Sequence, residues 1–450
     1  MATLYWGPSG GTSTGAWSSS NMTNWFSDVG RTTPASAAPT SIDDVVFDSV
    51  SDNGATFTVT VGTGAVCRNL TIQGLDQGMT LAGSAALSIY GGVNLSSTNL
   101  TRTYTGVITF AATSGSHHIT SGGVVFANSL KFDGSGGEWT LQDNLATNGG
   151  TSSIYGTRFN FNDKIFTCFL FNCSSTSVRT LDFGASGKIV ATGNNATVLG
   201  VATVTNLTII GEPRVELSYA GASGTRTIQG SSTGVLTGGT NTFSAYVTAG
   251  SDIVSMGGAG ALRTFDLSGF SGILSLGART LYGSFAVSAA ATLAAGTSTT
   301  TFAARTLGTT ITCNGQMLDF PIAFNGPGGE WQCQDALTQG ATRTFTFTSG
   351  TVRLKSGSTS TVGAFVTSGT TQKFLQSTVA GSQATLSQAS GTVGVSYLTI
   401  QDINATGGAM WNAYLSNSNV DGGNNVGWDF NVLQLGRYIY NRRKNKRILS

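Results

Sequence analysis

The sequence predicts an all-β fold, a right-handed parallel β-helix (β-solenoid) with aromatic-rich caps at its ends. Three observations support this prediction. Short apolar stretches recur along all 450 residues, no ten-residue stretch shows helical periodicity, and two distant segments are near copies of each other. Residues 132–143 and 324–335 are identical at eight of twelve positions. Repetition of this kind is typical of folds in which each unit buries its apolar face on its neighbours.

Alternating apolar and polar residues mark the individual strands, for example at residues 56–61, 87–90, 188–192 and 344–348. A period of two indicates strands with one buried face, and clusters of Gly, Ser, Thr and Asn separate them. Units of roughly 20–25 residues fit one turn of a β-helix, so we expect about 15–18 coils spaced ~4.8 Å apart. The alternative is a string of antiparallel β-sandwich modules. We favour the β-helix because two-residue Asn-Gly and Asp-Gly hairpin signals are scarce.

Tryptophans concentrate where caps are needed, because an open β-helix exposes strand edges at both ends. Trp6, Trp17 and Trp25 lie near the N-terminus, and Trp411 and Trp428 lie near the C-terminus. We therefore divide the chain into an N-terminal cap, a repetitive body, C-terminal coils with a closing turn, and a basic tail. These parts are residues 1–48, 49–395, 396–430 and 431–450.

Two smaller patterns predict how successive coils are matched. Eight of the sixteen arginines are followed by Thr, which suggests equivalent positions on successive coils. Gln142, Asn144 and the many other amides suggest ladders of stacked side chains at the corners, a stabilising use of polar residues in stacked strands.

Composition argues against a disordered chain and favours a particle or matrix component over a freely soluble cytosolic enzyme. Charged residues make up 10% of the sequence, against a usual figure of roughly 25%. Hydrophobic residues make up 40%, so the surface must be covered largely by Ser, Thr, Asn and Gln. The formal net charge of +2 comes from the tail, because residues 1–430 carry 17 basic against 21 acidic side chains.

The start of the sequence has neither a basic leader nor an apolar run, so we expect no Sec signal peptide. No uninterrupted apolar stretch approaches 18 residues, so we expect no membrane insertion. The five cysteines are odd in number, and the Cys168–Cys173 spacing has no partner pair elsewhere. This pattern predicts reduced, mostly buried thiols and no metal site.

The chain resembles a family of bacteriophage and prophage virion-associated β-helical proteins, which are tail-fibre-like or head-decoration-like. The resemblance rests on residues 5–7, 17, 24–25, 39–48, 67–71, 81–87, 179–184 and 422–430, and on both Gly-Gly-Glu-Trp segments. It spans most of the chain. It implies a component of a phage particle and assigns no chemistry.

The duplicated glutamates and the lone histidine pair are the first candidates for catalysis. Glu138 and Glu330 are two of four glutamates, and glycoside hydrolysis requires a carboxylate pair about 5–10 Å apart. As equivalent positions in two repeats, they are better explained by the same structural task performed twice. His117-His118 has no second cluster that would complete a metal site or a triad, so we interpret the pair as surface residues at a turn.

Acidic residues near the N-terminal cap are the candidates for a cation site. Asp43, Asp44, Asp48 and Asp52 offer the hard oxygen ligands that Ca²⁺ prefers, but Asp43-Asp44 before Val-Val-Phe also fits a strand-entry turn, which we favour. The glycines before Glu138 form no phosphate loop, because no Lys-Ser/Thr follows them. The sequence therefore predicts no catalytic residue, no metal and no cofactor.

The basic tail is the predicted partner-docking site, since it interleaves two tyrosines with six bases. Its residues are Arg437, Tyr438, Tyr440, Arg442, Arg443, Lys444, Lys446 and Arg447. Such an arm suits docking on an acidic face of a neighbouring virion protein. A solvated end and contacts with nucleic acid through phosphates and stacking are the alternatives.

Together with the resemblance, these features predict a non-enzymatic structural virion protein of a bacteriophage, assembled in the bacterial host cytoplasm. It would be a fibre-like or capsid-decorating element whose surface contacts the host or its glycans, with other capsid or tail proteins as partners. A homotrimer is expected only from the habits of phage β-helices. The alternatives are a tailspike-type polysaccharide depolymerase, which needs two or three converging acids, and a bacterial surface adhesin.

Overall fold

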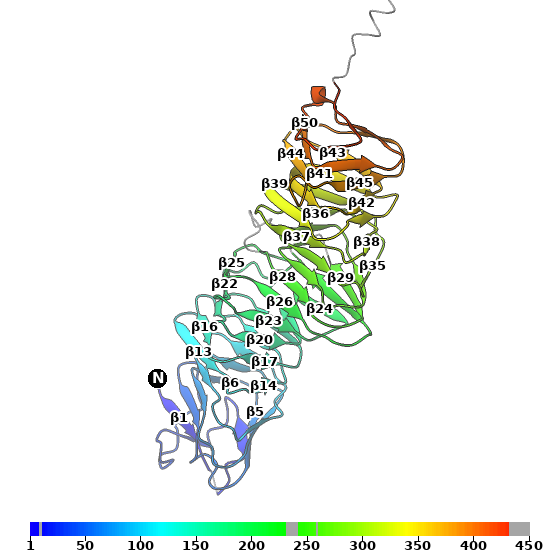
Figure 1. Cartoon of the computed structure of the whole chain (residues 1–450). Coiled ribbons are helices and arrows are strands. Elements are labelled where there is room, and N and C mark those ends of the chain that lie inside the picture. The colour runs from blue at the N-terminus through cyan, green and yellow to red at the C-terminus, as the bar shows by residue number, and fades with distance from the viewer. Residues whose placement is uncertain (9–10, 231–241, 258–259, 432–450) are drawn as a thin grey trace, which may run out of the picture. The chain divides into compact units, whose positions relative to one another are not determined.

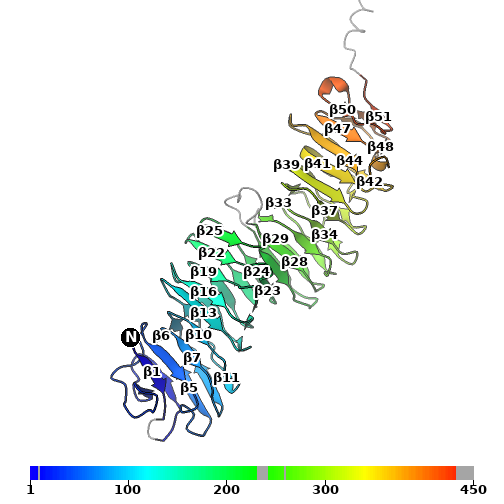
Figure 2. The same cartoon turned by 60° about the vertical axis from the view of Figure 1, so that its left-hand side comes forward.

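The computed structural model describes residues 1–8, 11–230, 242–257 and 260–431. Its elements are short β-strands and one 3-10 helix, η1 (Leu415–Asn417). The chain divides into two compact units, unit 1 (residues 1–263) and unit 2 (residues 264–450). In each unit the strands stack in parallel as coils, about 17 turns in all among the described residues (Figures 1 and 2). The predicted all-β solenoid is confirmed.

Unit 1 is built from coils that contribute one strand to each of three faces. Face 1 consists of β1 (Thr3–Trp6), β4 (Asp44–Phe47), β7 (Leu70–Ile72), β10 (Val93–Asn94), β13 (Ser116–Thr120), β16 (Glu138–Leu141), β19 (Arg158–Asn160), β22 (Arg179–Asp182) and β25 (Leu207–Ile210). Face 2 consists of β2 (Gly15–Trp17), β5 (Phe57–Val61), β8 (Met79–Gly83) and β11 (Leu100–Arg102), and then of β14 (Val125–Phe126), β17 (Leu145–Thr147), β20 (Ile165–Cys168), β23 (Lys188–Ala191), β26 (Arg214–Leu217), β28 (Ser244–Val247) and β30 (Ala261–Leu262). Face 3 consists of β6 (Ala65–Cys67), β9 (Leu87–Ile89), β12 (Ile108–Phe110), β15 (Leu130–Phe132), β18 (Thr151–Ile154), β21 (Leu170–Asn172), β24 (Ala196–Gly200), β27 (Thr225–Gln229) and β29 (Ile253–Gly257).

The core of unit 1 lies inside the coils, because the alternation in each strand turns every second side chain inward. On face 1 one inward column pairs residue to residue through six consecutive coils. Its members are Leu4, Val45, Leu70, Val93, Ile119 and Leu141, and all are buried. Burying one such side chain contributes about 1.5–3 kcal/mol, so the repeated column stabilises each coil on its neighbour.

The N-terminal end of unit 1 is closed by aromatic side chains and by an antiparallel strand. Trp6, Trp17 and Trp25 are fully buried and surround Phe47, with ring centroids 5.7–6.0 Å from its ring. β3 (Trp25–Phe26) pairs antiparallel with β1, and Phe26 bridges to Pro34 on its other side. A proline there covers the edge without offering a donor.

Unit 2 uses two long strands that turn from one face to the next, β39 (Ile322–Cys333) and β41 (Thr344–Leu354). One column of strands pairs with their C-terminal parts: β31 (Phe265–Leu267), β34 (Phe285–Val287), β37 (Thr309–Thr312), β44 (Lys373–Ser377), β47 (Leu398–Gln401) and β50 (Val420–Asp421). A second column pairs with their N-terminal parts: β33 (Arg279–Leu281), β36 (Thr300–Phe302) and β43 (Ala364–Thr367). The remaining strands are β32 (Ile273–Ser275), β35 (Thr292–Leu293), β38 (Met317–Leu318), β40 (Thr338–Gln339), β42 (Thr359–Val362), β45 (Ala384–Gln388), β46 (Thr392–Gly394), β48 (Ile403–Thr406), β49 (Met410–Asn412) and β51 (Trp428–Asp429).

Aromatic rings also lie in the last coils of unit 2. Trp411 and Trp428 meet edge to face with centroids 4.9 Å apart, and Trp411 lies 6.3 Å from Phe365. Trp411 is 4% exposed, so this cluster forms the final part of the described core.

The strand pairing excludes the alternative fold and contradicts one prediction about coil matching. The alternative of antiparallel sandwiches is contradicted, because the described pairings are parallel apart from β1–β3 and the Phe26–Pro34 bridge. The arginines of the Arg-Thr pairs do not occupy equivalent positions, since Arg102, Arg179 and Arg226 lie on faces 2, 1 and 3. A buried guanidinium can donate to backbone carbonyls at any corner of a coil, so these arginines are not restricted to one face.

The predicted amide ladders are largely replaced by bonds from amides to the backbone of the next coil. Asn144 Oδ1, for example, accepts a hydrogen bond from Ile165 N at 2.9 Å. Gln142 instead contacts a side chain, with its Nε2 2.8 Å from His118 Nδ1. An amide-to-amide contact does occur in unit 2, where Gln376 donates to Gln401 at 3.3 Å. Backbone groups that leave the strand ladder at corners need partners more than the amides need each other.

Two further findings concern the cysteines and membranes. All five cysteines are buried and unpaired, as predicted. Among the described residues no helix is long and apolar enough to cross a membrane.

Candidate functional site

The duplicated segment belongs to a larger duplicated block of two coils, residues 108–147 in unit 1 and 300–339 in unit 2. The two blocks are identical at 16 of 40 positions. They also correspond strand by strand. The strands β12, β13, β14, β15, β16 and β17 correspond to β36, β37, β38, the first part of β39, its last part, and β40. The block therefore supplies an internal comparison between residues that both copies keep and residues that only one copy has.

Glycines in both copies allow the chain to close tightly over the preceding coil. A Cβ on Gly134 would lie 1.8 Å from Ala112 O, and one on Gly326 would lie 2.1 Å from Ala304 O. No side chain fits at such a distance, so these glycines are required by packing. This agrees with the interpretation of the glycines as a tight corner.

Two contacts that occur in both copies hold the two coils of each block together. Phe110 stacks on Phe132 with centroids 4.5 Å apart, and Phe302 stacks on Phe324 at 5.0 Å. The Asp143 carboxylate accepts hydrogen bonds from Ser121 N and Gly122 N at 2.8 and 2.7 Å. Asp335 accepts them from Cys313 N and Asn314 N. The stacked rings pack in the core, and the aspartates satisfy backbone donors at a corner.

The duplicated glutamates each pair with an arginine of the following coil. Glu138 Oε1 lies 3.5 Å from Arg158 Nε, and Glu330 Oε2 lies 2.7 Å from Arg353 Nε. Burial raises the pKa of Glu330, but hydrogen bonds from Gln332 and Arg353 and the charge of Arg353 outweigh it, so the pKa lies below 4.5. The two glutamates thus make the same kind of contact between coils.

The histidine pair distinguishes the two copies, because unit 2 has Thr309 and Thr310 in the same place. His118 is exposed and its Nδ1 lies 2.8 Å from Gln142 Nε2. His117 is half-buried, with Nε2 3.0 Å from Ser114 O and its ring 5.7 Å from that of Trp139. The predicted turn is wrong, since both histidines lie within strand β13. Within the described part of the chain, neither histidine is bonded to a carboxylate as in a catalytic triad.

A shallow groove of about 540 Å³ runs over the outer side of face 1 and ends at these histidines. Strands β1, β4, β7, β10 and β13 line it with hydroxyl, amide, carboxylate and imidazole groups, including Asp44, Asn69, Asn94 and His118. The Asp44 carboxylate is already occupied by Arg68 Nε at 2.7 Å and Asn69 Nδ2 at 2.8 Å. The one carboxylate in the lining of the groove is therefore already paired.

Beside the histidines, two carboxylates of face 1 share one arginine. Arg158 lies between Glu138 and Asp182, with its NH2 group 2.8 Å from Asp182 Oδ2. The side chains of Glu138, Asp182 and Arg158 are 26%, 15% and 44% exposed. No motif in the sequence links Arg158 with Asp182. Strand pairing places Arg158 beside Glu138 and places Asp182 beside Asn160, two residues after Arg158, which brings the three charged side chains together.

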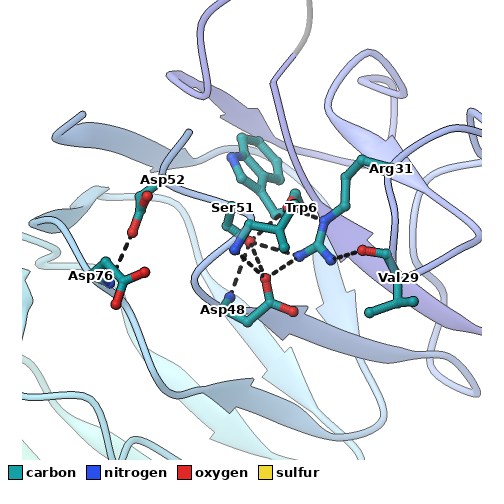
Figure 3. A network of polar contacts seen from close by, with 8 residues as sticks. Trp6, Val29, Arg31, Asp48, Ser51, Asp52 and Asp76 are labelled. Atoms are coloured by element: carbon teal, nitrogen blue, oxygen red, sulfur yellow. Dashed lines mark hydrogen bonds and ion pairs between the residues drawn. The ribbon is translucent and has the colours of Figure 1, made fainter. Parts of the chain in front are cut away.

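The acidic residues near the N-terminus bind groups of the cap and of the next coil. Arg31, 3% exposed, pairs with Asp48 and donates to Trp6 O at 3.1 Å and to Ser51 Oγ at 3.0 Å (Figure 3). The Asp52 carboxylate accepts a hydrogen bond from Asp76 N at 2.9 Å. The described residues contain no group of three or more His, Cys, Asp or Glu side chains placed to hold a metal ion.

Asp43 confirms the predicted strand-entry turn. Its carboxylate accepts hydrogen bonds from Thr40 N at 3.1 Å and Ala2 N at 2.8 Å. Burial raises its pKa, but the hydrogen bonds from Thr40 and Ala2 outweigh that effect, so the pKa lies below its usual value.

The predicted docking residues of the tail lie outside the described residues. These are Arg437, Tyr438, Tyr440, Arg442, Arg443, Lys444, Lys446 and Arg447.

Comparison with family models, curated proteins and solved structures found no match to this chain. The candidate site therefore rests on its own geometry.

Proposed function

We propose that this chain is a non-enzymatic structural protein of a bacteriophage particle, a fibre-like or capsid-decorating solenoid. In this proposal the groove on face 1 binds a neutral glycan of the host surface. The observation that carries the proposal is the lining of that groove, in which hydroxyl, amide and imidazole groups lie on successive strands. Strands repeat at about 4.8 Å, a spacing that lets successive sugar rings meet equivalent hydrogen-bonding groups. The phage assignment itself rests on the sequence resemblance.

The arrangement of charge favours binding over hydrolysis. A glycosidase needs one carboxylic acid held protonated in apolar surroundings and a second that stays ionised. Glu138 and Asp182 instead share the cation of Arg158. Both carboxylates of face 1 are thus already engaged by one guanidinium.

The binding proposal is tested with His118→Thr, which copies the residue of unit 2, and with Thr310→Ala as the matched control. Host polysaccharides are immobilised and binding of the purified chain is measured. Threonine has a hydroxyl but lacks the ring nitrogens of His118, and loss of their hydrogen bond weakens binding by about threefold to tenfold, whereas Thr310→Ala leaves it unchanged. Equal binding by the His118→Thr variant would place the glycan elsewhere, and no binding by the natural chain to any host glycan would end the proposal.

The depolymerase alternative is tested by release of reducing ends from the same polysaccharides. We expect none. Release of reducing ends by the natural chain that is lost in both Glu138→Gln and Asp182→Asn would establish an enzyme.

The virion assignment is tested by cryo-electron microscopy of purified phage particles, and it fails if the chain is absent from them.

A further inference from the structure

Four asparagines of the chain are followed directly by glycine, and such a pair is open to a reaction that most other pairs resist. They are Asn53, Asn148, Asn314 and Asn325. The backbone nitrogen of the glycine can attack the side-chain amide of the asparagine, because glycine has no Cβ to obstruct the approach. All four asparagines are exposed, so exposure alone does not decide which of them reacts.

In three of the four pairs a hydrogen bond holds one of the two reacting groups. The three contacts are Gly54 N with Asp52 Oδ1 at 2.9 Å, Asn314 Nδ2 with Val287 O at 2.8 Å, and Ser349 Oγ with Asn325 Oδ1 at 3.0 Å. The attack requires the held group to leave its partner first. Breaking one hydrogen bond of ordinary strength slows the reaction by about threefold to tenfold.

Asn148 differs from the other three, because neither of its reacting groups is held in this way. It lies in the corner between β17 and β18, where its own N–H donates to Phe126 O at 2.9 Å. That bond fixes the backbone of the corner and does not involve the side chain. Among the residues that the structure describes, neither the Asn148 side chain nor Gly149 N has a hydrogen-bond partner.

We propose that Asn148 is a site of spontaneous deamidation, with Gly149 N as the nucleophile. The nitrogen forms a bond to Asn148 Cγ, and the bond from Cγ to Nδ2 breaks. The proton of Gly149 N passes through solvent to the leaving nitrogen, which departs as ammonia. Water then opens the resulting succinimide ring at either of its two carbonyl carbons, which gives aspartate or isoaspartate. The net reaction consumes water and releases ammonia, and it needs no oxidant or reductant.

Isoaspartate disturbs this corner, because it lengthens the backbone where the chain is tightly packed. A Cβ on Gly149 would lie 2.3 Å from Ala127 O, so the corner has no room for a further backbone atom. We therefore expect the coil to open more readily at β17 and β18 once the reaction has occurred. This inference is independent of glycan binding, since Asn148 and Gly149 do not line the groove on face 1.

The test compares the four sites in the folded and the unfolded chain. The purified chain is incubated in mildly alkaline buffer, with and without denaturant, and each site is followed by peptide mass spectrometry. Dividing the folded rate by the unfolded rate removes the effect of the neighbouring sequence. We expect the fold to leave the rate at Asn148 nearly unchanged and to slow each of the other three sites by about threefold to tenfold.

Asn148→Gln is the matched control, because the longer side chain would have to close a less favourable six-membered ring. Hydrogen exchange of peptides that cover β17 and β18 should become faster as the natural chain ages and stay constant in Asn148→Gln.

Three results would overturn the proposal. The first is a rate at Asn148 that the fold slows as much as it slows the other three sites. The second is a product that contains aspartate without isoaspartate, because a succinimide opens to both. The third is hydrogen exchange at β17 and β18 that does not change after Asn148 has been converted, because the corner would then accept the longer backbone.

Discussion

The buried ion pair of unit 1 allows the sharpest test of how its coils are held together. Arg226 on β27 and Asp252, just before β29, have fully buried side chains. Arg226 donates to both carboxylate oxygens of Asp252, at 3.0 and 2.7 Å. It also donates to Leu217 O at 3.1 Å and Ala249 O at 2.8 Å. One guanidinium thus connects three segments of neighbouring coils.

Asp252→Asn keeps the shape of the side chain and removes its charge. The guanidinium is then left in the core without a counter-charge, and breaking a buried pair in this way costs about 3–5 kcal/mol. Even the lower figure raises the equilibrium for local opening by roughly a hundredfold or more. Arg226→Met should cost a similar amount. The double variant should cost less than the sum of the two, because neither charge is then left alone.

The assay is hydrogen exchange of peptides covering β26, β27 and β29, because stacked coils open locally and a global unfolding midpoint averages over them. Asp133→Asn is the control. Asp133 pairs with Lys131, but the two side chains are 39% and 40% exposed, and such a pair contributes about 0–1 kcal/mol. If Asp252→Asn changes the free energy of opening no more than Asp133→Asn does, the buried pair does not hold these coils.

Three further outcomes follow from the structure. Gly134→Ala should destabilise unit 1 strongly, because the new Cβ would lie 1.8 Å from Ala112 O. Gly394→Ala should not destabilise unit 2, because Gly394 has open space around it. Thermal unfolding of both variants measures the difference. The pKa of Glu330 is lowered in the folded state, so the ionised carboxylate stabilises the fold fully above the usual pKa of 4.5. This stabilisation is lost as the pH falls through the lower pKa of the folded state. Denaturant titrations at several pH values should show the loss in the natural chain and not in Glu330→Gln. Burial raises the pKa of the five cysteine thiols, so none should react with an alkylating reagent at neutral pH until the chain unfolds.

Local patterns in the sequence were sufficient to predict strands and caps. The alternation at residues 56–61 predicted β5, because a two-residue period has the same meaning in any sheet. The tryptophans predicted an aromatic cluster at the start of unit 1, because large apolar side chains that are not part of a regular strand pattern still have to be buried. These inferences needed no knowledge of which coil lies on which.

The candidate site could not be predicted in the same way, because it depends on register. Paired residues of face 1 are separated by 20 positions from Trp139 to Phe159 and by 28 positions from Leu181 to Ile209. Corner insertions of this size leave the core unchanged but shift every later contact between coils. No period in the sequence therefore brings Asp182 to Arg158, and only the stacked strands do.

Comparison of the two blocks separates structural from functional residues without any relative of the chain. Residues that both copies keep have contacts that explain them. Gly134 lets the chain pass close to a carbonyl, Asp143 caps two backbone donors, and Glu138 pairs with the next coil. His118 contacts Gln142 of the next coil, but Thr310 replaces it in a coil with corresponding strands, so the fold does not require a histidine there. A surface residue that the fold does not require is free to serve a ligand, and His118 borders the groove where the glycan is proposed to bind.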